Sequence, residues 1–116
     1  MERLSREELF HGATAISGCA PAFFFLALEA VADGAVAAGL PRSVALRLAA
    51  ETLVGSGELA REEHPALLKD KVCSPGGLTI QGVQRLEQGG LRGALFDAVS
   101  AAAARSEALE AAAPQI

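Results

Sequence analysis

Residues 74–79, called the SPGG segment here, read Ser-Pro-Gly-Gly-Leu-Thr and carry the chemistry that stands out most in this sequence. Two glycines let a ligand approach bare backbone, and the amides and dipole of a following helix favour an anion. The hydroxyls of Ser74 and Thr79 add two hydrogen-bond donors. Ser74 is a good N-cap and Pro75 a good first helical residue, so the pattern predicts a helix from here to Gln88. An ordinary capped loop can have the same sequence, and residue types alone predict only a candidate site for a small carboxylate.

No second motif for catalysis or cofactor binding accompanies it. The sequence has no strand leading into a GxGxxG turn, no Walker motif and no GxSxG elbow. Its two histidines, His11 and His64, and its two cysteines, Cys19 and Cys73, are far apart in the chain. We therefore expect no metal site, and we interpret the cysteines as reduced thiols of a cytoplasmic protein.

Size and composition indicate one helical domain over residues 1–116. Hydrophobic residues make up 51% of the chain, and alanine and leucine dominate. A domain of this size buries only about two-thirds of its unfolded surface, so this apolar content predicts a homodimer. The net charge is −4 and no basic stripe is present, which argues against a nucleic-acid partner.

An uncharged stretch at residues 12–28 raises the question of a membrane or export segment. Residues 16–19 resemble a lipoprotein cleavage site, but acidic and basic residues are mixed ahead of them. The stretch contains Gly18 and Pro21 and is shorter than the roughly 20 residues of a membrane span. We therefore expect a protein without a membrane partner.

Helical spacing of apolar residues predicts an all-α bundle of five to six helices. Glycine or proline separates most of the expected helices, which cover about residues 5–16, 22–38, 41–59, 65–69, 75–88 and 91–109. Ser5 is the expected N-cap of the first helix, and residues 17–21 are expected to interrupt or kink it. Phe23, Phe24 and Phe25 are interpreted as core and interface residues.

Five patterns, one of which contains the SPGG segment, follow one another along the chain. They are Ser-Gly-Cys-Ala-Pro-Ala at 17–22, Ala-Asp-Gly-x-Val-x-x-Gly-Leu-Pro-Arg at 32–42, His-Pro with Leu-Lys-Asp and Val at 64–72, Ser-Pro-Gly-Gly-x-Thr-Ile at 74–80, and Leu-Glu with Gly and Arg at 86–92. In this order they resemble the C-terminal domain of pyrroline-5-carboxylate reductase, over about residues 10–109. The resemblance implies a helical bundle that interlocks with its twin as a dimer. Whether dimers assemble into larger oligomers stays undecided.

For function, the resemblance implies NAD(P)H-dependent reduction of 1-pyrroline-5-carboxylate to L-proline. In the family a separate N-terminal Rossmann domain binds NAD(P)H, so this chain is expected to bind no cofactor and to be inactive alone. Thr79 would be catalytic, as a hydrogen-bond donor to the ring nitrogen. The residues implied at the substrate are Ser74, Gly76, Gly77, Leu78, Thr79 and Glu62.

The chain departs from the family pattern at three places. Cys19 and Ala20 replace Ser-Gly, Leu78 stands where Thr or Ala is usual, and Leu91 stands where Phe is usual. Two alternatives remain beside the reductase domain: a non-catalytic helical oligomerisation module, and the helical domain of another two-domain dehydrogenase. The SPGG segment argues against the second. The choice between NADH and NADPH stays open.

Overall fold

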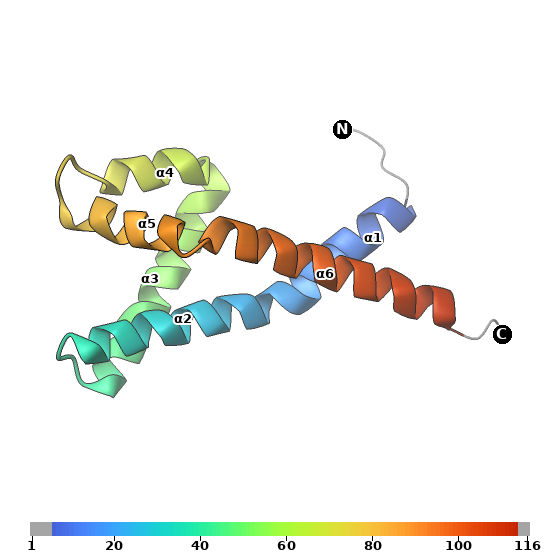
Figure 1. Cartoon of the computed structure of the whole chain (residues 1–116), viewed down its shortest axis with the longest axis horizontal. Helices are drawn as coiled ribbons and strands as arrows, with labels where there is room; N and C mark the ends of the chain where they lie inside the picture. The colour runs from blue at the N-terminus through green and yellow to red at the C-terminus, as the bar shows by residue number, and fades with distance from the viewer. Residues whose placement is uncertain (1–5, 114–116) are drawn as a thin grey trace. The chain divides into compact units, whose positions relative to one another are not determined.

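The structure, a computed structural model, describes residues 6–113, apart from the side chains of residues 7 and 8. In this part of the chain all regular structure is helical, which confirms the predicted all-α class. The elements are α1 (Arg6–Thr14), the π-helical turn η1 (Ala15–Cys19), α2 (Ala20–Ala37), α3 (Arg42–Glu62), α4 (Pro65–Val72), α5 (Leu78–Gln88) and α6 (Leu91–Ala112) (Figure 1). The expected N-cap Ser5 lies outside the described residues.

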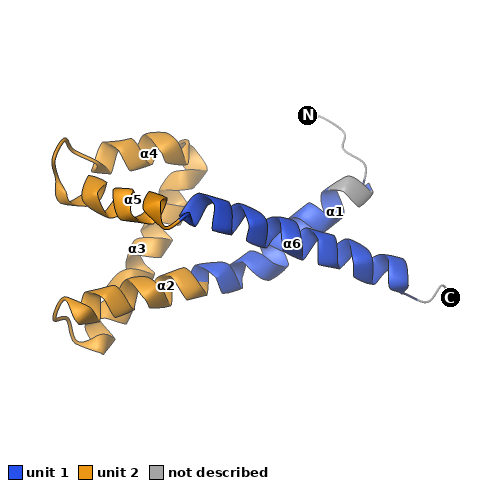
Figure 2. Ribbon diagram, in the orientation of Figure 1, with its two compact units in different colours: residues 1–24, 90–116 blue, residues 25–89 orange. Residues whose placement is uncertain are grey.

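The chain divides into two compact units (Figure 2). Unit 1 comprises Met1–Phe24 and Gly90–Ile116, and unit 2 is the intervening segment Phe25–Gly89. The SPGG segment belongs to unit 2. Unit 1 brings residues from the two ends of the sequence together.

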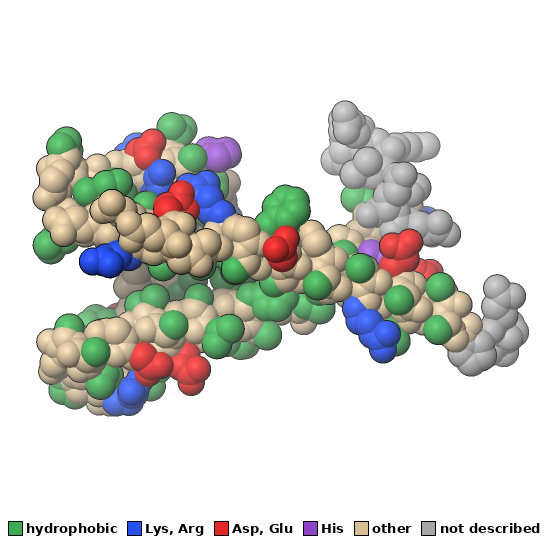
Figure 3. Space-filling view, in the orientation of Figure 1, with side chains coloured by type: hydrophobic (Ala, Val, Ile, Leu, Met, Phe, Trp, Pro, Cys, Tyr) green, Lys and Arg blue, Asp and Glu red, His purple; other side chains and the backbone are tan. Residues whose placement is uncertain are grey.

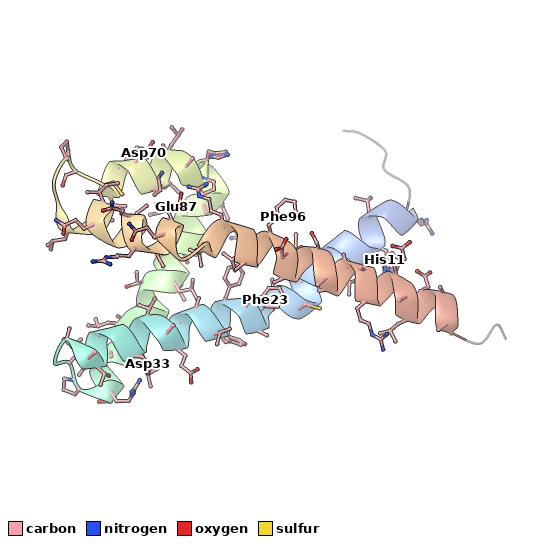
Figure 4. The ribbon with its side chains drawn as sticks, viewed as in Figure 1. His11, Phe23, Asp33, Asp70, Glu87 and Phe96 are labelled. Carbon is pink, nitrogen blue, oxygen red and sulfur yellow. The ribbon has the colours of Figure 1, made fainter. Side chains whose placement is uncertain are left out.

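In unit 1, α1 and η1 pack against α6. His11 bridges the helices: its Nδ1 lies 2.9 Å from the Ser106 hydroxyl and its Nε2 lies 2.7 Å from a Glu110 carboxylate oxygen. The His11 side chain is only 13% exposed, and Figure 4 shows it directed toward α6. Ala15 is fully buried. Small residues thus allow close helix packing, and His11 adds the polar contacts.

The predicted interruption at residues 17–21 is a π-helical turn within a continuous helix. The amide of Ala20 donates to the carbonyl of Ala15, five residues back, immediately before Pro21. Proline cannot donate a backbone hydrogen bond, and a π-turn is one way in which a helix accommodates such a loss. The resulting helix, Leu9–Ala37, is 29 residues long with a mean hydropathy of 1.8 in its most apolar window. By length and composition this helix is long enough to cross a membrane, because it extends beyond the uncharged residues 12–28 on both sides.

In unit 2, a tight corner joins α2 to α3. Gly39 has φ +111°, a conformation that favours glycine. Pro41 is the N-cap of α3, whose first helical residue is Arg42. The helix therefore begins one residue later than predicted. Asp33 and Arg42 form an ion pair across the corner. A glycine, a proline and an ion pair thus form this corner, and no large buried side chain contributes to it.

The buried core of the described chain is very small. Its members are all alanines: Ala15, Ala20, Ala32 and Ala45. Large apolar side chains remain exposed instead, among them Phe25 (67%), Leu26 (68%) and Phe96 (74%). Hydrophobic side chains are visible along α2 and α6 in Figure 3, and Phe96 projects from α6 in Figure 4.

This exposure corrects the expected core. Phe23 is half-buried, whereas Phe24 and Phe25 are exposed in the single chain. Ile80 and Leu86 of α5 are exposed as well. Burial of apolar surface is the main favourable term in folding, so these faces need cover that one copy does not provide.

Candidate functional site

The SPGG segment begins with a β-turn and not with a helix. The amide of Gly77 donates to the Ser74 carbonyl at 3.1 Å, and Gly76 has φ +68°. Proline at the second position and glycine at the third are typical of a type II turn. The helix α5 therefore starts at Leu78 with Gly77 as its N-cap. The prediction that Ser74 is the N-cap and Pro75 the first helical residue was wrong, because the Pro-Gly pair closes a turn first.

Ser74 crowds the space beside Gly77. A Cβ on Gly77 would lie 2.4 Å from the Ser74 hydroxyl oxygen and 3.3 Å from the Ser74 carbonyl oxygen. Its φ of −80° is open to any residue, so the restriction comes from the neighbouring serine and not from backbone conformation. The missing side chain therefore lets the Ser74 hydroxyl lie against the N-terminus of α5.

The start of α5 supplies hydrogen-bond donors for an anion. The amides of Leu78, Thr79 and Ile80 belong to the first turn, where no carbonyl of the helix can accept them. The amide of Gly77 is already used in the β-turn. An anion here would thus be held by first-turn amides and by the hydroxyls of Ser74 and Thr79.

The site is open on this chain. Ser74 and Thr79 are exposed, and the Leu78 side chain is 92% exposed. The substitution of Leu for the usual Thr or Ala leaves the Leu78 amide unchanged. A small cyclic carboxylate would rest on α5 and would need further walls to be enclosed.

Glu62 is the last residue of α3 and its side chain is exposed. No hydrogen bond or ion pair joins it to the SPGG segment within the described residues. Its neighbour Glu63 is engaged: Lys71 Nζ lies 2.7 and 2.9 Å from the two carboxylate oxygens. The structure thus assembles the turn and the start of α5, and it leaves Glu62 on a separate element of unit 2.

His64 has a structural role that was not predicted from the sequence. It is the N-cap of α4, and its Nδ1 accepts a hydrogen bond of 3.1 Å from the amide of Ala66. The His-Pro pair signals this start, since Pro65 is the first helical residue.

His11, Ser106 and Glu110 also escaped prediction, although their residue types are those of a hydrolytic triad. A hollow of about 780 Å³ lies beside them, lined partly by Gly12 and Glu107. Ser106, however, lies within α6, where the backbone amides are used by the helix, so there are no donors for an oxyanion. We interpret the cluster as a structural bridge. The described residues also contain no group of three or more side chains suited to a metal.

Comparison with known proteins decides the family. The sequence model described as pyrroline-5-carboxylate reductase dimerisation matches residues 7–109. The chain belongs to this family. The resemblance seen in the sequence patterns is thereby confirmed.

Individual relatives agree. Pyrroline-5-carboxylate reductase of Pisum sativum is 53% identical over 105 residues, which are 89% of this chain and 38% of the relative. The structure of the Coxiella burnetii reductase matches with a TM-score of 0.85 at 35% identity, over 91% of this chain and 40% of that one. The Plasmodium falciparum enzyme, solved with NADP bound, matches with a TM-score of 0.83 at 35% identity, over 92% and 41%. The chain thus spans about two-fifths of the length of these relatives.

Proposed function

We propose that this chain is the dimerisation and substrate-binding part of an NAD(P)H-dependent reductase that converts 1-pyrroline-5-carboxylate to L-proline. The observation that carries the proposal is the SPGG segment, in which Ser74 lies against Gly77 at the start of α5. This arrangement offers donors for a carboxylate within a chain of the reductase family. The cofactor supplies the hydride in the complete enzyme, and we assign none of its contacts to residues described here.

The proposed chemistry of the site follows from its donors. First-turn amides of α5 and the Ser74 hydroxyl hold the substrate carboxylate. Thr79, the second residue of α5, donates a hydrogen bond from its hydroxyl to the ring nitrogen. Reduction of the C=N bond adds a hydride to the carbon and a proton, supplied by water, to the nitrogen; a hydroxyl fixed beside that nitrogen would stabilise the charge that develops there. Glu62 contributes a carboxylate near the pocket.

A second copy of the chain completes the proposal. The exposed apolar side chains need cover, and helices of a twin provide it in an isologous dimer. Gly55 and Gly57 on α3 support this, because nothing lies within 4 Å of a Cβ built on either one. Their bare backbone leaves room for a close neighbour.

The same cover accounts for the long apolar helix Leu9–Ala37, which we assign to the dimer and not to a membrane. Glu29 and Asp33 lie in its second half, and charged side chains inside a bilayer are unfavourable. The proposed location is the cytoplasm. Recovery of the folded chain only in membrane or detergent fractions would contradict this assignment.

The alternative function is a non-catalytic oligomerisation module, which the openness of the site around Leu78 favours. Ligand binding separates the two. In an NMR titration of the ¹⁵N-labelled chain, L-proline should shift the amides of Gly76, Gly77 and Thr79. Thr79→Ala should weaken these shifts, whereas Thr52→Ala should not, because that hydroxyl bonds only to the Leu48 carbonyl within α3.

The same titration can contradict the proposal. Absence of saturable shifts in the SPGG segment with L-proline, in a chain shown to be folded, would favour the oligomerisation module. Equal shifts in the wild-type chain and in Thr79→Ala would remove Thr79 from its proposed role.

A further inference from the structure

An ion pair ties the end of α3 to the end of α4, directly before the SPGG segment. Glu63 follows the last residue of α3, and Lys71 lies in the last turn of α4, three residues before Ser74. The Lys71 Nζ contacts both carboxylate oxygens of Glu63, at 2.7 and 2.9 Å. We infer that Glu63 and Lys71 are positioning residues that fix the SPGG segment for a carboxylate ligand, an inference that rests on the proposed function.

The helix α4 needs such a tie. It has eight residues and no buried side chain, and helices this short are not stable alone in water. The helix α4 packs against α3, and the His64 side chain caps the start of α4. The ion pair with Glu63 holds its other end.

The held end passes directly into the candidate site. The amide of Cys73 donates to the Asp70 carbonyl at 3.1 Å, which closes the last turn of α4. Ser74 is the next residue, and its carbonyl accepts from Gly77 in the β-turn. Only Val72 and Cys73 separate Lys71 from Ser74, so a displacement of the end of α4 is passed to Ser74 through a short stretch of backbone.

The pair also separates the roles of two adjacent carboxylates. Glu63 is held by Lys71, and its side chain is 32% exposed. Glu62 is exposed and makes no hydrogen bond or ion pair within the described residues. Glu63 thus fixes the corner between the helices, and Glu62 keeps its carboxylate available to a ligand.

Positioning and simple electrostatics predict different results. If charge alone mattered, Glu63→Gln would remove a negative charge near the site and tighten anion binding, and Lys71→Met would weaken it. If the pair positions the segment, either change breaks the same tie and both weaken binding. The two single changes then act through one interaction, so the double change is no worse than either.

The test uses four variants of the full chain: Glu63→Gln, Lys71→Met, their combination, and the charge swap Glu63→Lys with Lys71→Glu. Lys69→Met is the matched control, because Lys69 pairs with its neighbour Asp70 at 3.3 Å and does not tie α4 to α3. Two quantities are measured by NMR, the hydrogen-exchange rate of the Gly77 amide without ligand and the affinity for L-proline. Sedimentation of each variant checks that its oligomeric state is that of the wild type.

We expect each single variant to raise the Gly77 exchange rate and to weaken L-proline binding by about two- to fivefold, as for a partly exposed ion pair. The charge swap should recover most of both losses, and Lys69→Met should change neither. Roughly 1 M salt, at which the screening length falls to about 3 Å, should speed Gly77 exchange in the wild type but not in the combined variant.

Unchanged Gly77 exchange in both single variants would overturn the inference, as would opposite effects of the two on binding. Should a variant fail to fold, the salt dependence of the wild type decides the matter. Failure of the wild type to bind L-proline would contradict the proposed function. The Gly77 exchange rates, which need no ligand, would still decide whether the pair positions the segment.

Discussion

The hydroxyl oxygen of Ser74 lies 2.4 Å from the point where a Cβ on Gly77 would stand. Gly77→Ala must therefore displace the Ser74 side chain or the start of α5. We expect a loss of up to about 1 kcal/mol in stability, because the exposed serine hydroxyl can rotate away while the backbone contact remains, together with weaker L-proline binding. Thermal unfolding and the NMR titration measure the two effects.

The matched double variant Ser74→Ala with Gly77→Ala separates the clash from other causes. Removing the hydroxyl leaves the Ser74 carbonyl contact at 3.3 Å and an ordinary contact with the residue 74 Cβ at 3.7 Å, so part of the lost stability should return. A Gly77→Ala chain as stable as the wild type, with unchanged binding, would show that the close approach is unimportant.

Gly39 allows a different prediction, because its restriction is conformational. Its φ is +111° and no atom lies within 4 Å of an added Cβ. Gly39→Ala should lower the free energy of unfolding by about 1 to 2 kcal/mol through backbone strain. Gly34→Ala, in the helical part of α2 with equally open space, should be neutral or stabilising. Equal stability of the two variants in denaturant titration would refute this distinction.

His11 should be the main polar anchor of α1 on α6. His11→Ala removes the contacts to Ser106 and Glu110, and we expect a loss of about 1 to 3 kcal/mol in stability. Faster amide exchange should be concentrated in α1 and η1. His64→Ala is the control, since its loss of a cap should affect α4 instead. Unchanged exchange in α1 upon loss of His11 would contradict its role as an anchor.

The helices could largely be predicted from the sequence, because glycine and proline separate them and apolar residues repeat at helical spacing. The exact start of α5 could not, because Ser74 and Pro75 fit both a helix start and a type II turn. The turn forms because Gly76 accepts a positive φ and Gly77 leaves space for Ser74. The π-turn before Pro21 could not be predicted in detail either: the sequence predicts an interruption or a kink at residues 17–21, but it does not say how a helix accommodates a missing donor.

Contacts between distant parts of the sequence were beyond prediction. His11 and Ser106 are 95 residues apart, and no periodicity connects them. Glu63 and Lys71 are eight residues apart. Their opposite charges lie at the two ends of a short helix, so this ion pair could have been predicted from the sequence. Apolar spacing identified Phe24 and Phe25, but spacing cannot distinguish a core within one chain from a face covered by a second one.

Oligomeric state tests the central claim most directly, namely that the chain belongs to a dimerisation domain whose apolar faces are covered by a twin. Only four alanines form the buried core of the described chain, whereas side chains such as Phe25 and Phe96 are exposed. Sedimentation velocity at a series of concentrations, with circular dichroism on the same samples, is the measurement. A helical dimer that persists at micromolar concentration, with thermal stability rising with concentration, is the predicted result. A stable, fully helical monomer at micromolar concentration would contradict it.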